Sequence, residues 1–225
     1  MALEARMMEL VRVDTQRAYD LIWEKITTLE LSPGSPISEQ DLAQEYNVGA
    51  VPVREAIGWL AHENLVRVTE RHGIYVADVN TQDLQQLSEM RLALESLSAR
   101  LAAERAQPDD LVVLEALRKE QAALAPEESR ELFDLDHKFH QAVAAAAHNR
   151  YLAQTLDRLF GLSRRLWYLV LPHLETLRSS VEMHLVLVEA IESRDPERAE
   201  MIMREHVGEF YSEVCEILTA QAEGA

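Results

Sequence analysis

Residues 133–140 read Phe133-Asp134-Leu135-Asp136-His137-Lys138-Phe139-His140, and the C-terminal two-thirds of the chain is organised around this stretch. When a helix advances by about 100° per residue, Asp136 falls in the middle of an apolar stripe, and His140 follows one turn later on the same face. Burying a carboxylate there is costly unless it pairs with a metal, with His140 or with a basic side chain from another helix. The apolar residues within a quarter-turn of Asp136 are Leu132, Phe133, Phe139, Val143, Ala144 and Ala147.

Two later segments repeat this arrangement, with His184 and His206 in the middle of apolar stripes. One carboxylate and three imidazoles suit a divalent ion such as zinc, nickel or manganese, and they leave positions on an octahedral ion open for water or a ligand carboxylate. A single histidine on an apolar face is more often a core residue than a ligand, so the spacing alone leaves both interpretations open. The apolar neighbours are Leu177, Val181, Leu187, Val188 and Ile191 around His184, and Ala199, Ile202, Met203, Phe210 and Ile217 around His206.

From residue 80 to residue 225 the pattern is wholly helical and predicts one domain, an antiparallel six-helix bundle. There is no long flexible linker and no internal repeat before or within it. The fold class is therefore mainly α. The predicted helices span residues 82–106, 109–124, 127–148, 150–171, 174–193 and 196–220.

The sequence also allows predictions for single polar residues of the bundle. Arg91 shares a helix face with Glu95 one turn on, which indicates either an ion pair that satisfies itself or a guanidinium that clamps an effector's carboxylate beside the metal. His137 and His148 are expected at the edge of the stripe, towards solvent. Cys215 is expected to be an inert packed thiol.

Charge and composition limit the kinds of function that the chain can have. The net charge of −17 argues against nucleic-acid binding and for solubility when it is taken alone. Residues 1–80 hold 7 Lys and Arg against 13 Asp and Glu, a net charge of −6, so any DNA contact depends on where individual arginines lie. No apolar run reaches the roughly 18 residues of a membrane span, and no signal peptide is evident. The single cysteine excludes an internal disulfide and a cysteine-based metal site, and we expect a cytoplasmic protein.

The N-terminal part of the chain predicts three helices. Helical periodicity over residues 15–31 ends at a run of serine, proline and glycine, residues 32–36. Residues 38–41 then form a capping box for a short helix, which stops near Asn47. A third helix is predicted from Val51 to Glu63, and the residues facing inward are Val53, Ile57 and Leu60.

Two β-rich segments, 65–69 and 74–78, follow these helices and flank a hairpin tip at residues 70–73. Helix, short helix, turn, helix and hairpin form the outline of a winged helix-turn-helix, here residues 1–79. In that fold the third helix enters the major groove and the wing touches the DNA backbone. Hydrogen-bond donors to DNA are expected at the start of the third helix and at the tip. The candidate DNA-binding residues are Gln40, Ala50, Val51, Arg54, Arg71, His72 and Gly73.

The N-terminal region resembles the DNA-binding domain of the GntR family over residues 12–79. The family usually has Ser-Arg where this chain has Gly49-Ala50, and that arginine normally contacts the DNA backbone or bases. The resemblance is carried by Leu31 to Gly34, Ile37 to Ala43, the distinctive Pro52-Val53-Arg54-Glu55-Ala56 core, Leu60, Leu65-Val66 and Gly73.

Residues 82–220 resemble the FCD ligand-binding domain of the same family, as found in its FadR subfamily. The pattern Asp136-x-x-Phe139-His140, followed by the helices that carry His184 and His206, is similar to the metal-binding pattern of this domain. The six-helix count favours the metal-binding, VanR-like branch over the seven-helix branch that binds acyl-CoA. The resemblance implies that Asp136, His140, His184 and His206 ligate a divalent metal ion.

These observations favour a ligand-responsive repressor. A small organic acid is expected to bind at the metal, beside Arg91 and Glu95, and to alter how a homodimer presents its winged helices to an inverted repeat in double-stranded operator DNA. The alternative is a metal-dependent hydrolase that uses Glu95, Glu209 or Glu213 as a base beside metal-bound water. A third interpretation is a metal that only holds the bundle together.

Overall fold

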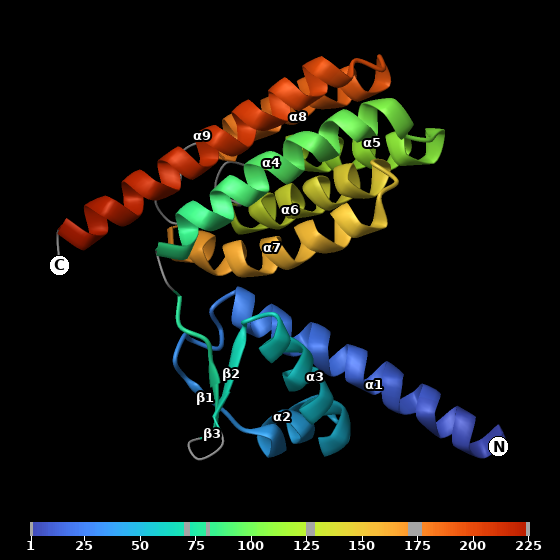
Figure 1. Cartoon of the computed structure of the whole chain (residues 1–225), viewed down its shortest axis with the longest axis vertical. Helices are drawn as coiled ribbons and strands as arrows, with labels where there is room; N and C mark the ends of the chain where they lie inside the picture. The colour runs from blue at the N-terminus through green and yellow to red at the C-terminus, as the bar shows by residue number, and fades with distance from the viewer. Residues whose placement is uncertain (1, 70–72, 80–81, 125–128, 171–176, 224–225) are drawn as a thin grey trace. The chain divides into compact units, whose positions relative to one another are not determined.

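The structure is a computed structural model that describes residues 2–69, 73–79, 82–124, 129–170 and 177–223. The chain divides into two units, Met1–Asn80 and Thr81–Ala225. Both units are mainly α-helical, and the first also holds a three-stranded sheet, so the predicted fold class is confirmed (Figure 1). Among the described residues, no helix is both long and apolar enough to cross a membrane.

The first unit is a helix-turn-helix followed by a wing. Its elements are α1 (Ala2–Thr27), β1 (Pro36–Ile37), α2 (Glu39–Tyr46), α3 (Ala50–His62), β2 (Val66–Thr69) and β3 (Gly73–Val76). α1 packs along α3, and the predicted inward face of α3 is buried. The buried side chains of these two helices include Ala18, Ile22 and Ile26 of α1 and Val53, Ile57 and Leu60 of α3.

Local interactions set the ends of the helices in this unit. Ser38 caps α2 by accepting a hydrogen bond from a backbone N–H of the first turn, as predicted. Asn47 ends α2 in a left-handed conformation, with φ of 51°. α1 ends at Thr27 rather than at Leu31, because Leu29 adopts a φ of 62° that breaks the helix before the proline and glycine of the following loop.

The wing is an antiparallel sheet with strand order β1-β3-β2. Strands β2 and β3 were predicted, whereas the two-residue β1 lies next to a run of residues that reads as a breaker. β1 forms because Ile37 pairs with Ile74 of β3 and buries its side chain. Thr69 lies opposite Gly73 across the hairpin, where Gly73 has a φ of 99° that favours glycine.

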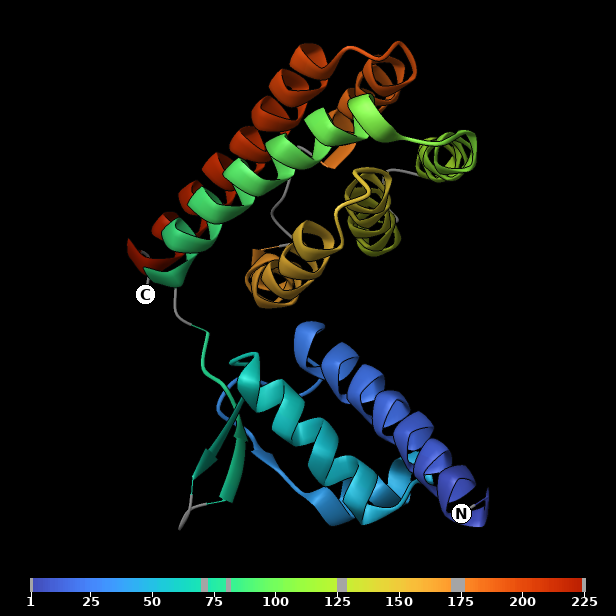
Figure 2. The ribbon, with the colours of Figure 1, turned by 45° about the vertical axis from the view of Figure 1, so that its right-hand side comes forward.

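The second unit is the six-helix bundle, and the structure confirms the six predicted helices among the residues it describes. They are α4 (Gln82–Arg105), α5 (Pro108–Ala123), α6 (Ser129–Ala146), α7 (Arg150–Val170), α8 (Leu177–Glu192) and α9 (Pro196–Glu223). α4 and α9 lie side by side (Figures 1 and 2). α6 contacts α4, α5, α7 and α8, so the stripe around Asp136 is enclosed by other helices.

Candidate metal centre and DNA-binding surface

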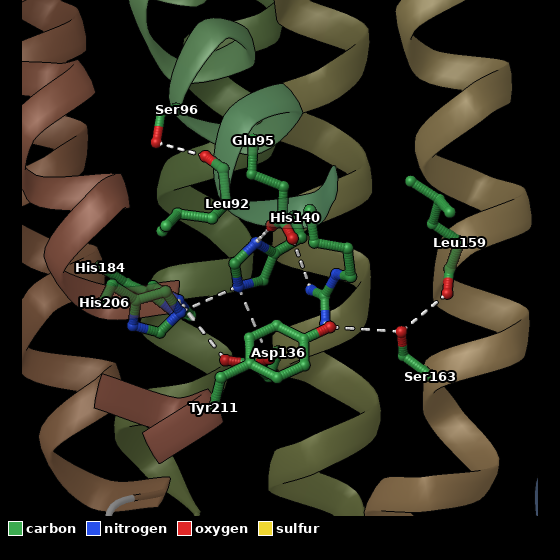
Figure 3. Close-up of polar contacts among 11 residues, drawn as sticks. Leu92, Glu95, Ser96, Asp136, His140, Leu159, Ser163, His184, His206 and Tyr211 are labelled. Atoms are coloured by element: carbon green, nitrogen blue, oxygen red, sulfur yellow. Dashed lines mark hydrogen bonds and ion pairs between the residues drawn. The ribbon is translucent and has the colours of Figure 1, made fainter. Parts of the chain in front are cut away.

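Four side chains with metal-ligating groups converge inside the second unit. Asp136 and His140 come from α6, His184 from α8 and His206 from α9. One ligand atom of each residue lies within 4.8 Å of the corresponding atoms of the others (Figure 3). The three imidazoles are buried, and the Asp136 side chain is 17% exposed. Helix projection thus identified side chains that meet, and metal binding by them stays a prediction.

The spacing of these atoms fits a single ion. Nε2 of His206 lies 2.9 Å from Nε2 of His140 and 3.4 Å from Nε2 of His184. The two carboxylate oxygens of Asp136 lie 3.4 Å from Nε2 of His184 and 3.6 Å from Nε2 of His140. Ligands held about 2.1 Å from an ion in octahedral or tetrahedral geometry lie about 3.0–3.4 Å from one another. The donor set and its spacing therefore suit zinc, nickel or manganese.

Burial keeps two of the three imidazoles neutral. It lowers the pKa of His184 well below the ordinary value and lowers the pKa of His206 to about 3. Burial also acts against the charged form of His140, but the carboxylates of Glu95 and Asp136 outweigh it and raise the pKa of that imidazole. A neutral imidazole offers the lone pair that a metal requires, so His184 and His206 can accept a cation without first losing a proton.

Two residues from other helices contact the Nδ1 atoms of His184 and His140. Nδ1–H of His184 donates to Oε1 of Gln121 on α5 at 3.0 Å, which leaves Nε2 of the neutral ring unprotonated and facing the cluster. Nδ1 of His140 lies against a carboxylate oxygen of Glu95 on α4. Such partners orient histidine ligands in metal sites. Gln121 was missed in the sequence, although its position seven residues after the buried Leu114 places it on the same face of α5.

The Arg91–Glu95 ion pair forms inside the bundle. Nη2 of Arg91 lies 2.6 Å from Oε1 of Glu95, and both side chains are buried. The guanidinium carbon lies 4.2 Å from the ring centre of Phe160 and 4.1 Å from that of Trp167, so the cation packs against two aromatic rings. Burial raises the pKa of Glu95, but Arg91 and His140 outweigh it and lower the pKa to about 2.

Arg91 also links the pair to two other helices. Its Nη1 donates to the hydroxyl of Tyr211 on α9 at 3.3 Å. That hydroxyl lies 3.3 Å from Oγ of Ser163 on α7 (Figure 3). The cluster therefore draws polar side chains from all six helices of the bundle.

Two predictions about single residues of the bundle were wrong. His137 is buried, its ring centre lies 4.7 Å from that of Phe160, and burial lowers its pKa to about 3. The prediction failed because α7 covers this flank of α6 and widens its buried face. Cys215 is exposed rather than packed. His148 is exposed as predicted, and its Nε2 lies 2.8 Å from a carboxylate oxygen of Asp110.

The candidate DNA-binding residues lie on the surface where the structure describes them. Arg54 on α3 has a side chain that is 67% exposed and makes a two-pronged contact with Glu39, the shortest distance being 2.9 Å. Ala50 and Val51 are exposed in the first turn of α3. Gln40 of α2 and Gly73 of β3 are exposed as well, whereas Arg71 and His72 lie outside the described residues.

Comparison with known proteins gives consistent matches over both units. Residues 86–209 match the FCD domain, and residues 14–76 match the family described as bacterial regulatory proteins, gntR family. The HTH-type transcriptional repressor GlaR of Escherichia coli is 33% identical over 175 residues, which cover 74% of this chain and 80% of that relative. The HTH-type transcriptional repressor RspR of Escherichia coli is 28% identical over 203 residues, which cover 90% of this chain and 89% of that relative.

The fold has a counterpart among solved structures. Escherichia coli McbR/YncC superposes with a TM-score of 0.78 at 19% sequence identity. The superposition covers 90% of this chain and 97% of that chain. The fold described above therefore recurs in a solved structure.

Removing one imidazole from the cluster should remove the bound metal. We expect one divalent ion for each wild-type chain and much less than one for His184→Ala, because His184 is one of the four predicted ligands and is fully buried. The measurement is elemental analysis of protein dialysed against zinc, nickel or manganese and then freed of excess ion. His148→Ala is the matched control, since this exposed histidine lies outside the cluster. Equal metal content in wild type and His184→Ala would remove His184 from the site.

Removing the partner of His184 should weaken metal binding without removing a ligand. Gln121→Leu should lower the metal affinity about 10- to 100-fold, because His184 loses the acceptor that fixes its orientation and its proton. Gln121→Glu keeps an acceptor oxygen at this position and should retain most of the affinity. Competition with a chromophoric chelator measures the affinity, and urea unfolding of the metal-free proteins tests for a general loss of stability. A similar loss in both variants contradicts the orienting role.

Proposed function

Because this chain belongs to the GntR family of bacterial regulatory proteins and carries an FCD domain, we propose that it is a repressor controlled by a small organic acid. The acid binds at a divalent metal ion held by Asp136, His140, His184 and His206. The convergence of these four ligand atoms within 4.8 Å is the observation that carries the proposal. Repression is supported by the relatives GlaR and RspR, which are both described as repressors.

The chemistry of the donor set supports a sensing role for the metal. Four protein ligands leave open positions on an octahedral ion, and the ion supplies a Lewis-acidic partner for a carboxylate oxygen. The protein side chains keep the donors buried and, at His184 and His206, neutral. The metal is zinc, nickel or manganese in this proposal.

Arg91 is the residue proposed to hold the effector's carboxylate. Its guanidinium is buried against Phe160 and Trp167, and its Nε–H has no hydrogen-bond partner among the residues that the structure describes. A buried donor without a partner is costly, and an entering carboxylate satisfies it. Glu95 already occupies one edge of the guanidinium, so the acid must share Arg91 with Glu95 or displace it.

Exposed apolar side chains support the proposal of a homodimer. Met90 and Leu97, seven residues apart on α4, are 49% and 41% exposed, and Met201 on the neighbouring α9 is 60% exposed. Side chains at this spacing fall on one side of a helix and can pack against a partner helix. A dimer would present two copies of α3 to the half-sites of an inverted repeat.

The hydrolase alternative loses its support. The relatives are transcriptional regulators, and this chain is a regulator of the same family rather than an enzyme. The low pKa of Glu95 and its contacts with Arg91 and His140 make it a weak general base. Glu209 is exposed on α9. The chelator experiment below distinguishes a sensing metal from one that only stabilises the bundle.

The proposal is tested by DNA binding with and without acids and metal. Metal-loaded protein should shift duplex DNA from the region upstream of its own gene at low salt, where phosphate contacts are strongest. At least one member of a panel of small carboxylic acids should release the DNA, and the amide of the same acid should not. Treatment with a chelator should abolish the response to the acid.

Each failure of this experiment has a different meaning. If no duplex binds at low salt, the repressor proposal is wrong. An acid that releases DNA equally well from chelator-treated protein would show that the metal is not part of the effector site. If chelation unfolds the bundle and no acid acts on the loaded protein, the metal only stabilises the fold.

Arg54 gives a second test, directed at the DNA-binding surface. Arg54→Ala should lower the affinity for the upstream DNA about tenfold or more and reduce the salt dependence, because a groove-facing or phosphate-facing cation is lost. Gel shifts at several salt concentrations measure both effects. Arg204→Ala is the control, since Arg204 is an exposed, carboxylate-paired arginine on the bundle. The role of Arg54 is refuted if both variants bind as wild type does.

A further inference from the structure

The first turn of α3 presents an apolar surface where a DNA-reading helix would ordinarily offer polar groups. Gly49 is the N-cap and has no side chain, and Ala50 and Val51 follow it on the exposed side. The Val51 side chain is 57% exposed, whereas Pro52 and Val53 are buried. An exposed valine at this place therefore contributes nothing to the core of the unit.

Few other side chains of α3 are available to form the hydrogen bonds with DNA that the first turn lacks. Arg54 lies one turn after Ala50 and is the exposed cation beside the apolar pair. Glu55 is exposed but accepts a hydrogen bond from Oγ1 of Thr15 on α1 at 2.9 Å. Trp59, further along the helix, packs against Tyr19 of α1 with 6.0 Å between ring centres.

Base edges in the major groove limit what such a surface can recognise. Guanine, adenine and cytosine present donors and acceptors there, and covering them with an isopropyl group would leave these groups unpaired. The C5-methyl group of thymine is the one apolar feature of a base edge in that groove. Apolar contact with this methyl group is favourable because it removes both surfaces from water.

We propose that Ala50 and Val51 read the C5-methyl group of a thymine in each operator half-site, beside the base or phosphate contacted by Arg54. The inference rests on the proposed binding of α3 in the major groove. It specifies the chemistry of one operator position: an apolar methyl contact takes the place of a hydrogen bond from a side chain. Val51 is the larger contributor, because its side chain is the more extended apolar group.

The test begins with selection of binding sites from a random-sequence duplex library by the full-length, metal-loaded protein. The selected sites should share a thymine in each half-site. Deoxyuridine, which lacks only the methyl group, then replaces each thymine in turn. At the position that faces Val51, the substitution should weaken binding about fourfold for each half-site, the effect of one buried methyl group.

A double substitution assigns the effect to Val51. Val51→Ala should weaken binding to the thymine site by a similar factor and should make binding insensitive to deoxyuridine at that position. Val112→Ala is the matched control, because Val112 is a 68% exposed valine on α5 of the bundle. It should bind both duplexes as the wild type does.

The outcomes separate this inference from the proposed function. The methyl contact is wrong if no thymine of the selected sites is sensitive to deoxyuridine. It is also wrong if the losses of binding free energy caused by Val51→Ala and by deoxyuridine are additive. Both results would leave DNA binding by the protein intact. Failure to enrich any duplex would overturn operator binding itself and the inference with it. A Val51→Ala variant that binds normally but alters the oligomeric state would place Val51 in a protein interface and also overturn the inference.

Discussion

The arrangement of the bundle depends on one buried carboxylate, that of Glu95. A lone carboxylate in such surroundings would cost several kcal/mol or shift to its neutral form, and here Arg91 on one side and His140 on the other keep it charged. The contact with His140 joins α4 to α6 at the level of the candidate metal centre, whereas Arg91 and Glu95 both lie on α4. A buried ion pair of this kind adds little net stability.

The same carboxylate connects the two proposed parts of the effector site. Glu95 shares one oxygen with Arg91 and the other with Nδ1 of His140, whose Nε2 faces the cluster. An acid that draws Arg91 away from Glu95 changes the charge felt by His140. The link from Arg91 to Tyr211 carries the same change to α9. In the proposed effector site, the acid and the metal would thereby be linked by a chain of direct contacts.

Helical periodicity was sufficient to predict which polar side chains face the interior of the bundle, whereas their assignment as metal ligands came from the family resemblance. Asp136, His140, His184 and His206 each lie mid-stripe on a helix, and a polar residue in that position must meet others of its kind. The winged helix was likewise visible in its breaker, cap and hairpin signals. Local patterns set these features, so they could be read without knowledge of the packing.

Features that arise from contacts between elements could not be read in this way. The burial of His137 depends on α7 covering a flank of α6. Gln121 acquires its role only because α5 brings it to Nδ1 of His184. The two-residue β1 exists through its pairing with β3, and its first residue, Pro36, belongs to the predicted breaker. Sequence periodicity describes one element at a time, whereas each of these three features depends on contact between two elements.

The position of Trp167 gives the molecule a natural optical reporter. The chain has three tryptophans, and Trp23 and Trp59 belong to the winged-helix unit. Trp167 is the one in the bundle, where its buried indole stacks on the guanidinium of Arg91. Any event that moves this cation changes the electric field across the indole and shifts its emission. The emission of Trp167 thus reports on the position of the Arg91 guanidinium without an added label.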